Sequence, residues 1–433
     1  RQCSSSSSDR FVGNDRSSDR TFFGSDTRKA LDSFMAKTAE VIVVGGGVIG
    51  SAVTFELARR SVDVLLIDKT LPGRATSASA GGLWPVGEAV GLGCGIIHHQ
   101  SHSKSGVLND ELLLPGFFRD FLAQSNSYFP ELAAELKEFG GVDIEYEPGA
   151  GLMFLYFNEE EKQFVQLVAD SLPQENNLEV LSALEAKEIE PQLTGDLLGA
   201  ARLADEHQVN PMLLAEGFKR AAIALGAEFR HETKAAELCR EGDKIVGVQV
   251  EEERFSCKTV VNAAGAWAGN LAETAKIRLP IFPVRGQVVL TQTLPHVLNA
   301  CLSNSGCYIL QKKHGEVLIG STTENAGFDV SVTPEAITHL CNAAVRTVPC
   351  LRHVGIKRVW SGLRPGTQDE LPILGPMENI SGYMNATGGF RTGIVASPLT
   401  GRIVAQQITD QELDFPIETF LASRFKRTAA ETR

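Results

Sequence analysis

A glycine-rich turn between two apolar runs limits the fold of this chain more than any other feature. The run Val41–Val44 leads into GGGVIG at positions 45–50. Residues 48–60 then have helical composition, and residues 62–67 form a second apolar run. Two parallel strands need a crossover connection, so this strand, helix and strand order predicts a parallel sheet and an α/β fold.

The same turn carries the GxGxxG spacing of a dinucleotide site. Gly45 permits a tight turn, Gly47 lets the backbone approach a pyrophosphate, and Gly50 lets helix and strand pack closely. Free amides and the positive dipole at the helix start favour a phosphate. Asp68 ends the second strand, where an acid can accept hydrogen bonds from ribose hydroxyls. The spacing leaves NAD and FAD as alternatives.

Two further stretches indicate one long cofactor. Small residues and hydroxyls fill RATSASAGG at 74–82, and TGGFRTG at 387–393 is a second glycine-rich turn near the other end of the chain. Such turns let a flat cofactor approach the backbone closely.

The rest of the chain predicts a two-part α/β protein with interleaved segments. Residues 211–225 and 334–346 are typical of helices, and residues 228–260, 287–290 and 317–319 are typical of short strands. His98, His99 and His102 come without a matching acid or cysteine, so no metal site is predicted.

Composition excludes several classes of function. The chain has 433 residues, with 41 Lys and Arg against 53 Asp and Glu, and a net charge of −12. Nucleic acid and anionic lipid call for clustered positive charge, so neither is an expected partner. No uncharged apolar run approaches the roughly 18 residues of a membrane span. Eight cysteines without a CxxC pair favour reduced thiols and a cytoplasmic protein.

Both ends of the chain are expected to lie outside the folded core. Residues 1–38 include the serine run 4–8 and few large apolar side chains, so we expect a disordered N-terminal extension. Residues 426–433 are expected to be a flexible tail.

Five motifs together resemble the FAD-dependent glycine and D-amino acid oxidase family. They are VIVVGGGVIG, RATSASAGG, VVNAAGAWA (260–268), SGLRPGTQDELPILGP (361–376) and NATGGFRTGI (385–394). The resemblance implies a Rossmann-type FAD-binding domain interleaved with an α+β substrate domain. The expected FAD-binding segments are 39–111, 187–270 and 356–425, and the expected substrate segments are 112–186 and 271–355.

The resemblance also assigns the site. Arg364 matches the family's carboxylate-binding arginine, whose planar fork suits an amino acid carboxylate. Tyr308 matches the active-site tyrosine, whose hydroxyl helps to hold the carboxylate; a core tyrosine with a satisfied hydroxyl is the alternative. Arg391 matches an arginine beside the flavin that either binds substrate or fixes its turn. The residues expected to hold FAD are Gly45, Gly47, Val48, Ile49, Gly50, Asp68, Lys69, Ser77, Ala78, Ser79, Ala80, Gly81, Gly82, Ala264, Gly265, Gly388, Gly389, Phe390, Arg391, Thr392, Gly393 and Ile394.

Within the family, residues 78–97 most resemble the catalytic subunits of bacterial hydrogen cyanide synthases. This implies hydride transfer from glycine or a similar small amino acid to flavin, in a complex whose partner subunits carry an iron–sulfur cluster. No C-x4-C-x2-C run is present in this chain to hold such a cluster. Partner subunits could also bring the protein to a membrane periphery. The alternatives are a self-sufficient oxidase that makes hydrogen peroxide, an opine or proline dehydrogenase subunit, and a non-enzymatic electron-relay or structural subunit that binds flavin without turning over substrate. Gly306 departs from some glycine oxidases, which have a histidine there.

Overall fold

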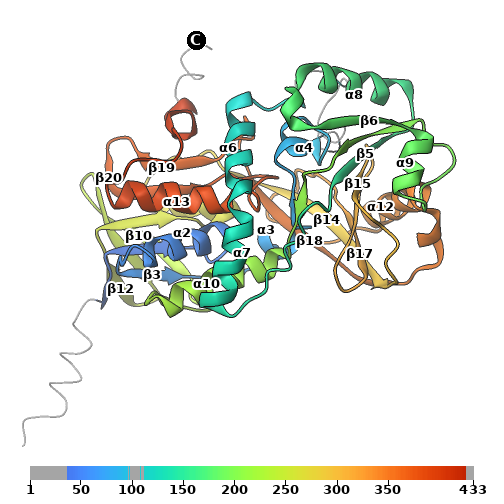
Figure 1. The fold of residues 1–433 in the computed structure, drawn as a ribbon. Helices are drawn as coiled ribbons and strands as arrows, with labels where there is room; N and C mark the ends of the chain where they lie inside the picture. Colours follow the sequence, from blue (N-terminus) through green and yellow to red (C-terminus); the bar gives the residue numbers. More distant parts are fainter. Residues whose placement is uncertain (1–36, 96, 98–107, 109–111, 426–433) are drawn as a thin grey trace, which may run out of the picture. The chain divides into compact units, whose positions relative to one another are not determined.

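Two large β-sheets organise the chain (Figure 1). The computed structural model describes residues 37–95, 97, 108 and 112–425. The tail 426–433 lies outside the described residues, as does the extension 1–38 except for Lys37 and Thr38, which form strand β1.

The first sheet contains the predicted parallel core. Its strands run in the order β12-β11-β20-β13-β2-β3-β9, with β10 beside β11 and β19 beside β20. The neighbours β20, β13, β2, β3 and β9 are all parallel. The bounds are β2 (Val41–Val44), β3 (Val64–Ile67), β9 (Glu228–Arg230), β10 (Ala235–Glu241), β11 (Lys244–Val250), β12 (Glu253–Ser256), β13 (Thr259–Asn262), β19 (Ile373–Met377) and β20 (Ile380–Thr387). The expected strand, helix and strand unit is therefore confirmed.

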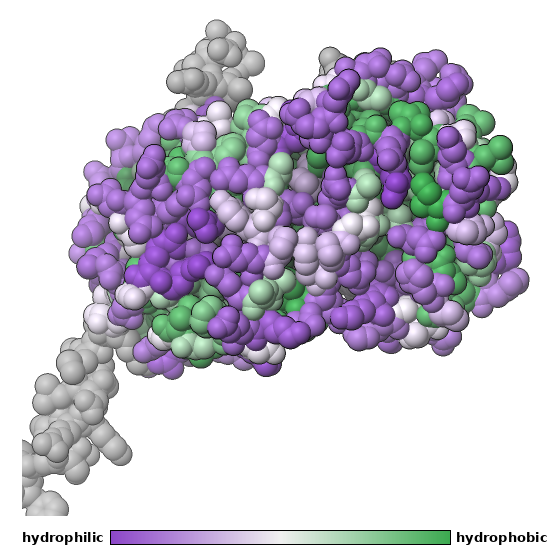
Figure 2. Space-filling model, in the orientation of Figure 1, coloured by the Kyte–Doolittle hydropathy of each residue, from purple (hydrophilic) through white to green (hydrophobic). Residues whose placement is uncertain are grey.

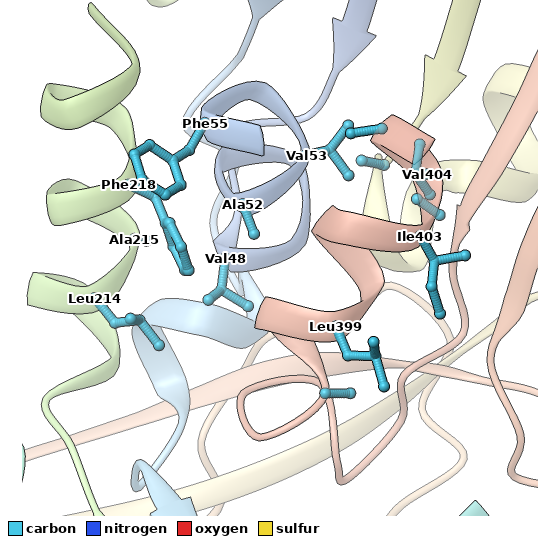
Figure 3. Packing of buried hydrophobic residues seen from close by; sticks show 14 of the residues in the cluster. Val48, Ala52, Val53, Phe55, Leu214, Ala215, Phe218, Leu399, Ile403 and Val404 are labelled. Atoms are coloured by element: carbon cyan, nitrogen blue, oxygen red, sulfur yellow. The ribbon is translucent and has the colours of Figure 1, made fainter. Parts of the chain in front are cut away.

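Helix α2 (Val48–Ala58) is the centre of the largest core cluster. It packs between α10 (Pro211–Ala224) and α13 (Ser397–Ile408), as Figure 3 shows for their facing side chains. The rings of Phe55 and Phe218 lie 5.8 Å apart between α2 and α10. A Cβ at Gly401 of α13 would lie 2.9 Å from the Ala52 backbone, so glycine permits the close approach of α13 to α2. Helix α2 is thus packed on two sides, by α10 and by α13.

The helix starts follow from local sequence. Asn210 caps α10 by accepting hydrogen bonds from the backbone N–H groups of Met212 and Leu213, and Pro211 occupies the first helical position. Thr333 caps α12 (Pro334–Thr347) in the same way. Both helices lie where the sequence predicted them.

The second sheet has eight strands in the order β18-β14-β17-β16-β15-β5-β7-β6. Helices α8 (Glu159–Ser171), α9 (Ala183–Ile189) and α12 lie beside it in Figure 1. The strand bounds are β5 (Leu152–Tyr156), β6 (Leu178–Ser182), β7 (Gly199–Leu203), β14 (Phe282–Thr293), β15 (Cys301–Ser303), β16 (Tyr308–Gln311), β17 (Glu316–Gly320) and β18 (Ile356–Gly366). In Figure 2 the visible face is largely hydrophilic, with hydrophobic side chains gathered over this sheet.

Some segments pack differently from the expected domain boundaries. Strands β7 and β18 fall in segments assigned to FAD binding, yet both pair within the second sheet. Helices α6 (Gly116–Ser127) and α7 (Phe129–Gly140) fall in a segment assigned to the substrate domain, yet they contribute to the core around α2. The boundaries themselves stay a prediction.

Candidate active site

A cavity of about 480 Å³ lies where residues of both sheets meet. The first sheet contributes the carboxyl ends of its parallel strands, with Val44 of β2, Ile67 of β3 and Ala263 directly after β13. The second sheet contributes Tyr308 of β16 and Arg364 of β18. Ligands of open α/β sheets bind outside the carboxyl ends of the strands, so this is the expected place for a cofactor.

The glycines of the first turn allow its tight geometry. Gly45 has φ +107°, and a Cβ there would lie 2.4 Å from the Ala263 carbonyl oxygen. A Cβ at Gly50 would lie 1.8 Å from the Gly45 carbonyl oxygen, so any side chain would separate helix from strand. Gly47 stands at the N-cap of α2 with no capping side chain. Gly47 therefore adds no side chain of its own at the helix start, which fits the close approach of a pyrophosphate.

Asp68 is held at the end of β3 by two partners. Its Oδ1 accepts a hydrogen bond from the Gly46 N–H at 2.8 Å, and its Oδ2 pairs with Arg74 Nη1 at 3.0 Å. Thr76 Oγ1 accepts a hydrogen bond from the Val48 N–H at 3.0 Å. Arg74 and Thr76 both line the cavity, although neither was predicted as a site residue; in the sequence they stand among the small residues of RATSASAGG.

Most residues expected to hold the cofactor line this cavity. They are Gly45, Gly47, Val48, Ile49, Asp68, Lys69, Ala78, Ser79, Ala80, Gly81, Gly82, Ala264, Gly265, Gly389, Phe390, Arg391, Gly393 and Ile394. This long set, drawn from five separate stretches of the chain, fits a group as extended as FAD.

Four expected residues are not among those lining the cavity, and three of them have local roles. Gly50 packs against Gly45, as described above. Ser77 is exposed and donates to the Arg74 carbonyl oxygen at 3.1 Å. Thr392 donates to the Gly389 carbonyl oxygen at 3.1 Å and so closes the second glycine turn. The fourth is Gly388, which lies in the same turn with φ +78°. Contact between these four residues and the cofactor stays a prediction.

Arg364 presents its guanidinium to the cavity. Nη1 donates to the Thr322 carbonyl oxygen at 3.1 Å, and Nη2 donates to Ser321 Oγ. A Cβ at Gly286 would lie 2.5 Å from Nη1, so the guanidinium lies directly over that glycine. The hydrogen bonds that the structure gives Arg364 go to neutral oxygens, which leaves its charge for an anionic ligand.

Tyr308 is 4% exposed and lies edge-on to Trp84, with ring centroids 5.9 Å apart. Burial raises the pKa of Tyr308, so its hydroxyl stays protonated and can donate a hydrogen bond. Together Arg364 and Tyr308 form a pair of donors suited to a carboxylate. Gly306 is not among the residues lining the cavity, and a Cβ there would meet Ala343 of α12 at 3.1 Å.

Arg391 is bound between two carboxylates. Its Nη1 donates to Glu88 Oε2 at 3.2 Å, and its Nη2 donates to Glu370 Oε2 at 2.7 Å. The side chain is only 5% exposed. Of the two roles expected for Arg391, this geometry favours fixing its turn over binding a substrate carboxylate.

Sequence reasoning missed Glu88 and Cys94, which both line the cavity. The Cys94 N–H donates to both carboxylate oxygens of Glu88 at 3.3 Å. Burial raises the pKa of both side chains, and Arg391 opposes the shift of Glu88. The available signal was an acid within the apolar stretch GGLWPVGEAVGLG.

Two further findings concern the described residues alone. Among them, no group of three or more His, Cys, Asp or Glu side chains could hold a metal ion, and the predicted absence of a metal stays a prediction because His98, His99 and His102 lie outside them. No helix in the part of the chain that the structure describes is long and apolar enough to cross a membrane.

Known proteins share this architecture along nearly the whole chain. A family model described as FAD dependent oxidoreductase (DAO) matches residues 40–407. Hydrogen cyanide synthase subunit HcnC of Pseudomonas aeruginosa is 42% identical over 408 residues, covering 90% of this chain and 97% of that protein. The crystal structure of glycine oxidase from Geobacillus kaustophilus is 31% identical with a TM-score of 0.78, covering 90% of this chain and 99% of the other.

A more distant structure shares the fold alone. L-proline dehydrogenase from P. horikoshii has 23% identity and a TM-score of 0.72, covering 91% of this chain and 99% of the other. The expected fold class and the resemblance are confirmed. The chain therefore belongs to the DAO family of FAD-dependent oxidoreductases, and its cofactor is FAD.

Proposed function

We propose that this protein oxidises glycine or a similar small amino acid as the catalytic subunit of a hydrogen cyanide synthase-type complex. The observation that carries the proposal is the guanidinium of Arg364, which lies in the FAD cavity with neutral hydrogen-bond partners. The relative HcnC, a subunit of hydrogen cyanide synthase by name, supports this choice of substrate and complex.

The roles of the chain's own residues follow from the geometry. Arg364 holds the substrate carboxylate, and the Tyr308 hydroxyl donates a further hydrogen bond to it. The rigid strands β16 and β18 that carry these residues fix the orientation of the substrate, and orientation supplies much of the rate of such a reaction. FAD, when bound, supplies the hydride acceptor.

Partner subunits are part of the proposal. Conversion of glycine to hydrogen cyanide and carbon dioxide removes four electrons, which exceeds the capacity of one flavin. A partner subunit that carries an iron–sulfur cluster would accept the electrons that the flavin cannot hold. We further propose that the complex is cytoplasmic. Where it associates with a membrane, the partner subunits provide the contact.

A specific observation also favours a second function. The glycine oxidase of Geobacillus kaustophilus is similar over 90% of the chain, so a stand-alone oxidase that reduces oxygen to hydrogen peroxide is the rival. A proline or opine dehydrogenase subunit is a further alternative.

One experiment distinguishes these functions. The purified flavoprotein is mixed with glycine without oxygen, its visible spectrum is followed, and peroxide and cyanide are assayed after air is admitted. Bleaching with slow reoxidation until partner subunits are added supports the proposal. Bleaching with prompt, stoichiometric peroxide supports the stand-alone oxidase. Bleaching by proline or an opine but not by glycine contradicts the proposed substrate.

A further inference from the structure

Glu88 is a buried carboxylate in the cavity to which the proposed function gives no role. It lies on the short helix α4 (Pro85–Ala89) with its side chain 6% exposed. The start of α4 is fixed by Glu206, whose Oε1 accepts hydrogen bonds from the Val86 and Gly87 N–H groups at 3.0 Å. A Cβ at Gly93 would lie 2.8 Å from the Glu88 carboxyl carbon. The carboxylate is therefore held in place from several sides.

The charged side chains around Glu88 give the cavity one positive and one negative region. Glu88, Arg364 and Arg391 all line it, whereas Glu370 does not. Arg391 is shared by Glu88 and Glu370, so one guanidinium faces two carboxylates. Arg364 hydrogen-bonds to neutral oxygens. The four side chains together have a net charge of zero. The positive charge of Arg364 has no acidic hydrogen-bond partner, whereas Glu88 shares its cationic partner with a second carboxylate.

A zwitterion matches this arrangement better than a simple anion. A carboxylate on Arg364 leaves the remaining three side chains with a net charge of −1, and a cationic group beside Glu88 restores neutrality. Buried charge is costly unless it is paired, so the second pairing favours ligands that carry an ammonium group. Burial raises the pKa of Glu88, and a neighbouring ammonium would stabilise its charged form.

We propose that Glu88 binds the amino group of the substrate while Arg364 binds its carboxylate. Glu88 is thus a specificity-determining residue that selects amino acids over carboxylates lacking an amine. This inference rests on the proposed function, because it names the residue that recognises the second charged group of the same substrate.

Glycine and glycolate provide the test, since they differ only by a hydroxyl in place of the ammonium. The glycine dissociation constant is taken from the saturation of anaerobic bleaching. The glycolate constant is taken from its perturbation of the flavin spectrum. The wild-type flavoprotein should bind glycine about tenfold more tightly than glycolate, or better. Glu88→Gln should bring the ratio close to one by weakening glycine and, because the uncompensated negative charge is gone, by strengthening glycolate.

Glu370→Gln is the matched control, because Glu370 is the other acidic partner of Arg391 and does not line the cavity. Glu370→Gln should lower the glycine-to-glycolate ratio less than Glu88→Gln does, because it lets Arg391 neutralise Glu88 but keeps the carboxylate that lines the cavity. Equal affinities in the wild type, or an unchanged ratio in Glu88→Gln, would overturn the inference. If Glu88→Gln fails to retain its flavin, the affinity ratios of the wild type and of Glu88→Asp still test the inference. Glu88→Asp keeps the negative charge and should keep a preference for glycine. Failure of wild-type bleaching by glycine would instead refute the proposed function.

Discussion

Lys312 offers a sharp prediction about stability and pH. It follows β16, and its Nζ donates to the Ala80 carbonyl oxygen and, at 3.3 Å, to the Val209 carbonyl oxygen. Ala80 belongs to the loop that lines the FAD cavity. The composition of Lys312-Lys313-His314 is that of a solvated turn, yet burial lowers the pKa of Lys312 to about 8.

The size and sign of the effect follow from this shift. Below pH 8 Lys312 is protonated in both the folded and the unfolded state, so burial of its ammonium group destabilises the folded state by the full amount. Between pH 8 and 10.5 the folded state loses its proton first, so this group makes stability rise with pH. From pH 7.5 to pH 10 we expect Lys312 to add about 2 kcal/mol to the free energy of unfolding.

Comparison of wild type with Lys312→Met isolates this contribution. Urea unfolding is followed by circular dichroism at several pH values, and the free energy of the variant is subtracted from that of the wild type. The free energy of unfolding of the wild type, minus that of the variant, should increase by about 2 kcal/mol as pH rises from 7.5 to 10. Lys313→Met changes the exposed neighbouring residue. It should leave the pH dependence of the free energy of unfolding the same as in the wild type. A constant difference for Lys312→Met would refute the reasoning.

Three further substitutions test the cofactor site, the substrate site and the core. Gly47→Val should abolish FAD binding because its side chain fills the cavity beside Thr76, and a variant that stays fully yellow would contradict this. Arg364→Ala should keep FAD yet raise the glycine dissociation constant at least about tenfold in anaerobic titrations, whereas an unchanged constant would remove Arg364 from the site. Phe218→Ala should lower the free energy of unfolding by about 3 to 5 kcal/mol in urea, since it removes the ring packed on Phe55; a loss under about 1 kcal/mol would count against that packing.

The parts of the fold that were predictable are those set by short-range sequence patterns. The glycines at 45–50 determine a turn, and the apolar run before them makes a strand buried on both faces. Helices α10 and α12 were predictable because an N-capping residue and a proline mark each start. In each case the neighbouring residues contain most of the information.

The parts that escaped prediction depend on contacts between distant segments. Glu88 and Arg391 are 303 residues apart, so nothing local indicates that they pair. Arg364 was found because a family motif surrounds it, whereas Glu88 lies in an apolar stretch that reads as core. The pairing of β7 and β18 within the second sheet likewise depends on partners far along the chain.

The position of β20 in the first sheet has a consequence for biosynthesis. This strand is made late in the chain, yet it lies between β11 and β13 in the interior of the sheet. The turn that follows it, residues 389–394, closes one wall of the FAD cavity. A nascent chain that has not released these residues from the ribosome has neither a complete sheet nor a complete pocket. Flavin capture is therefore expected only after residues 389–394 have been synthesised, since a chain truncated before them would lack one wall of the pocket.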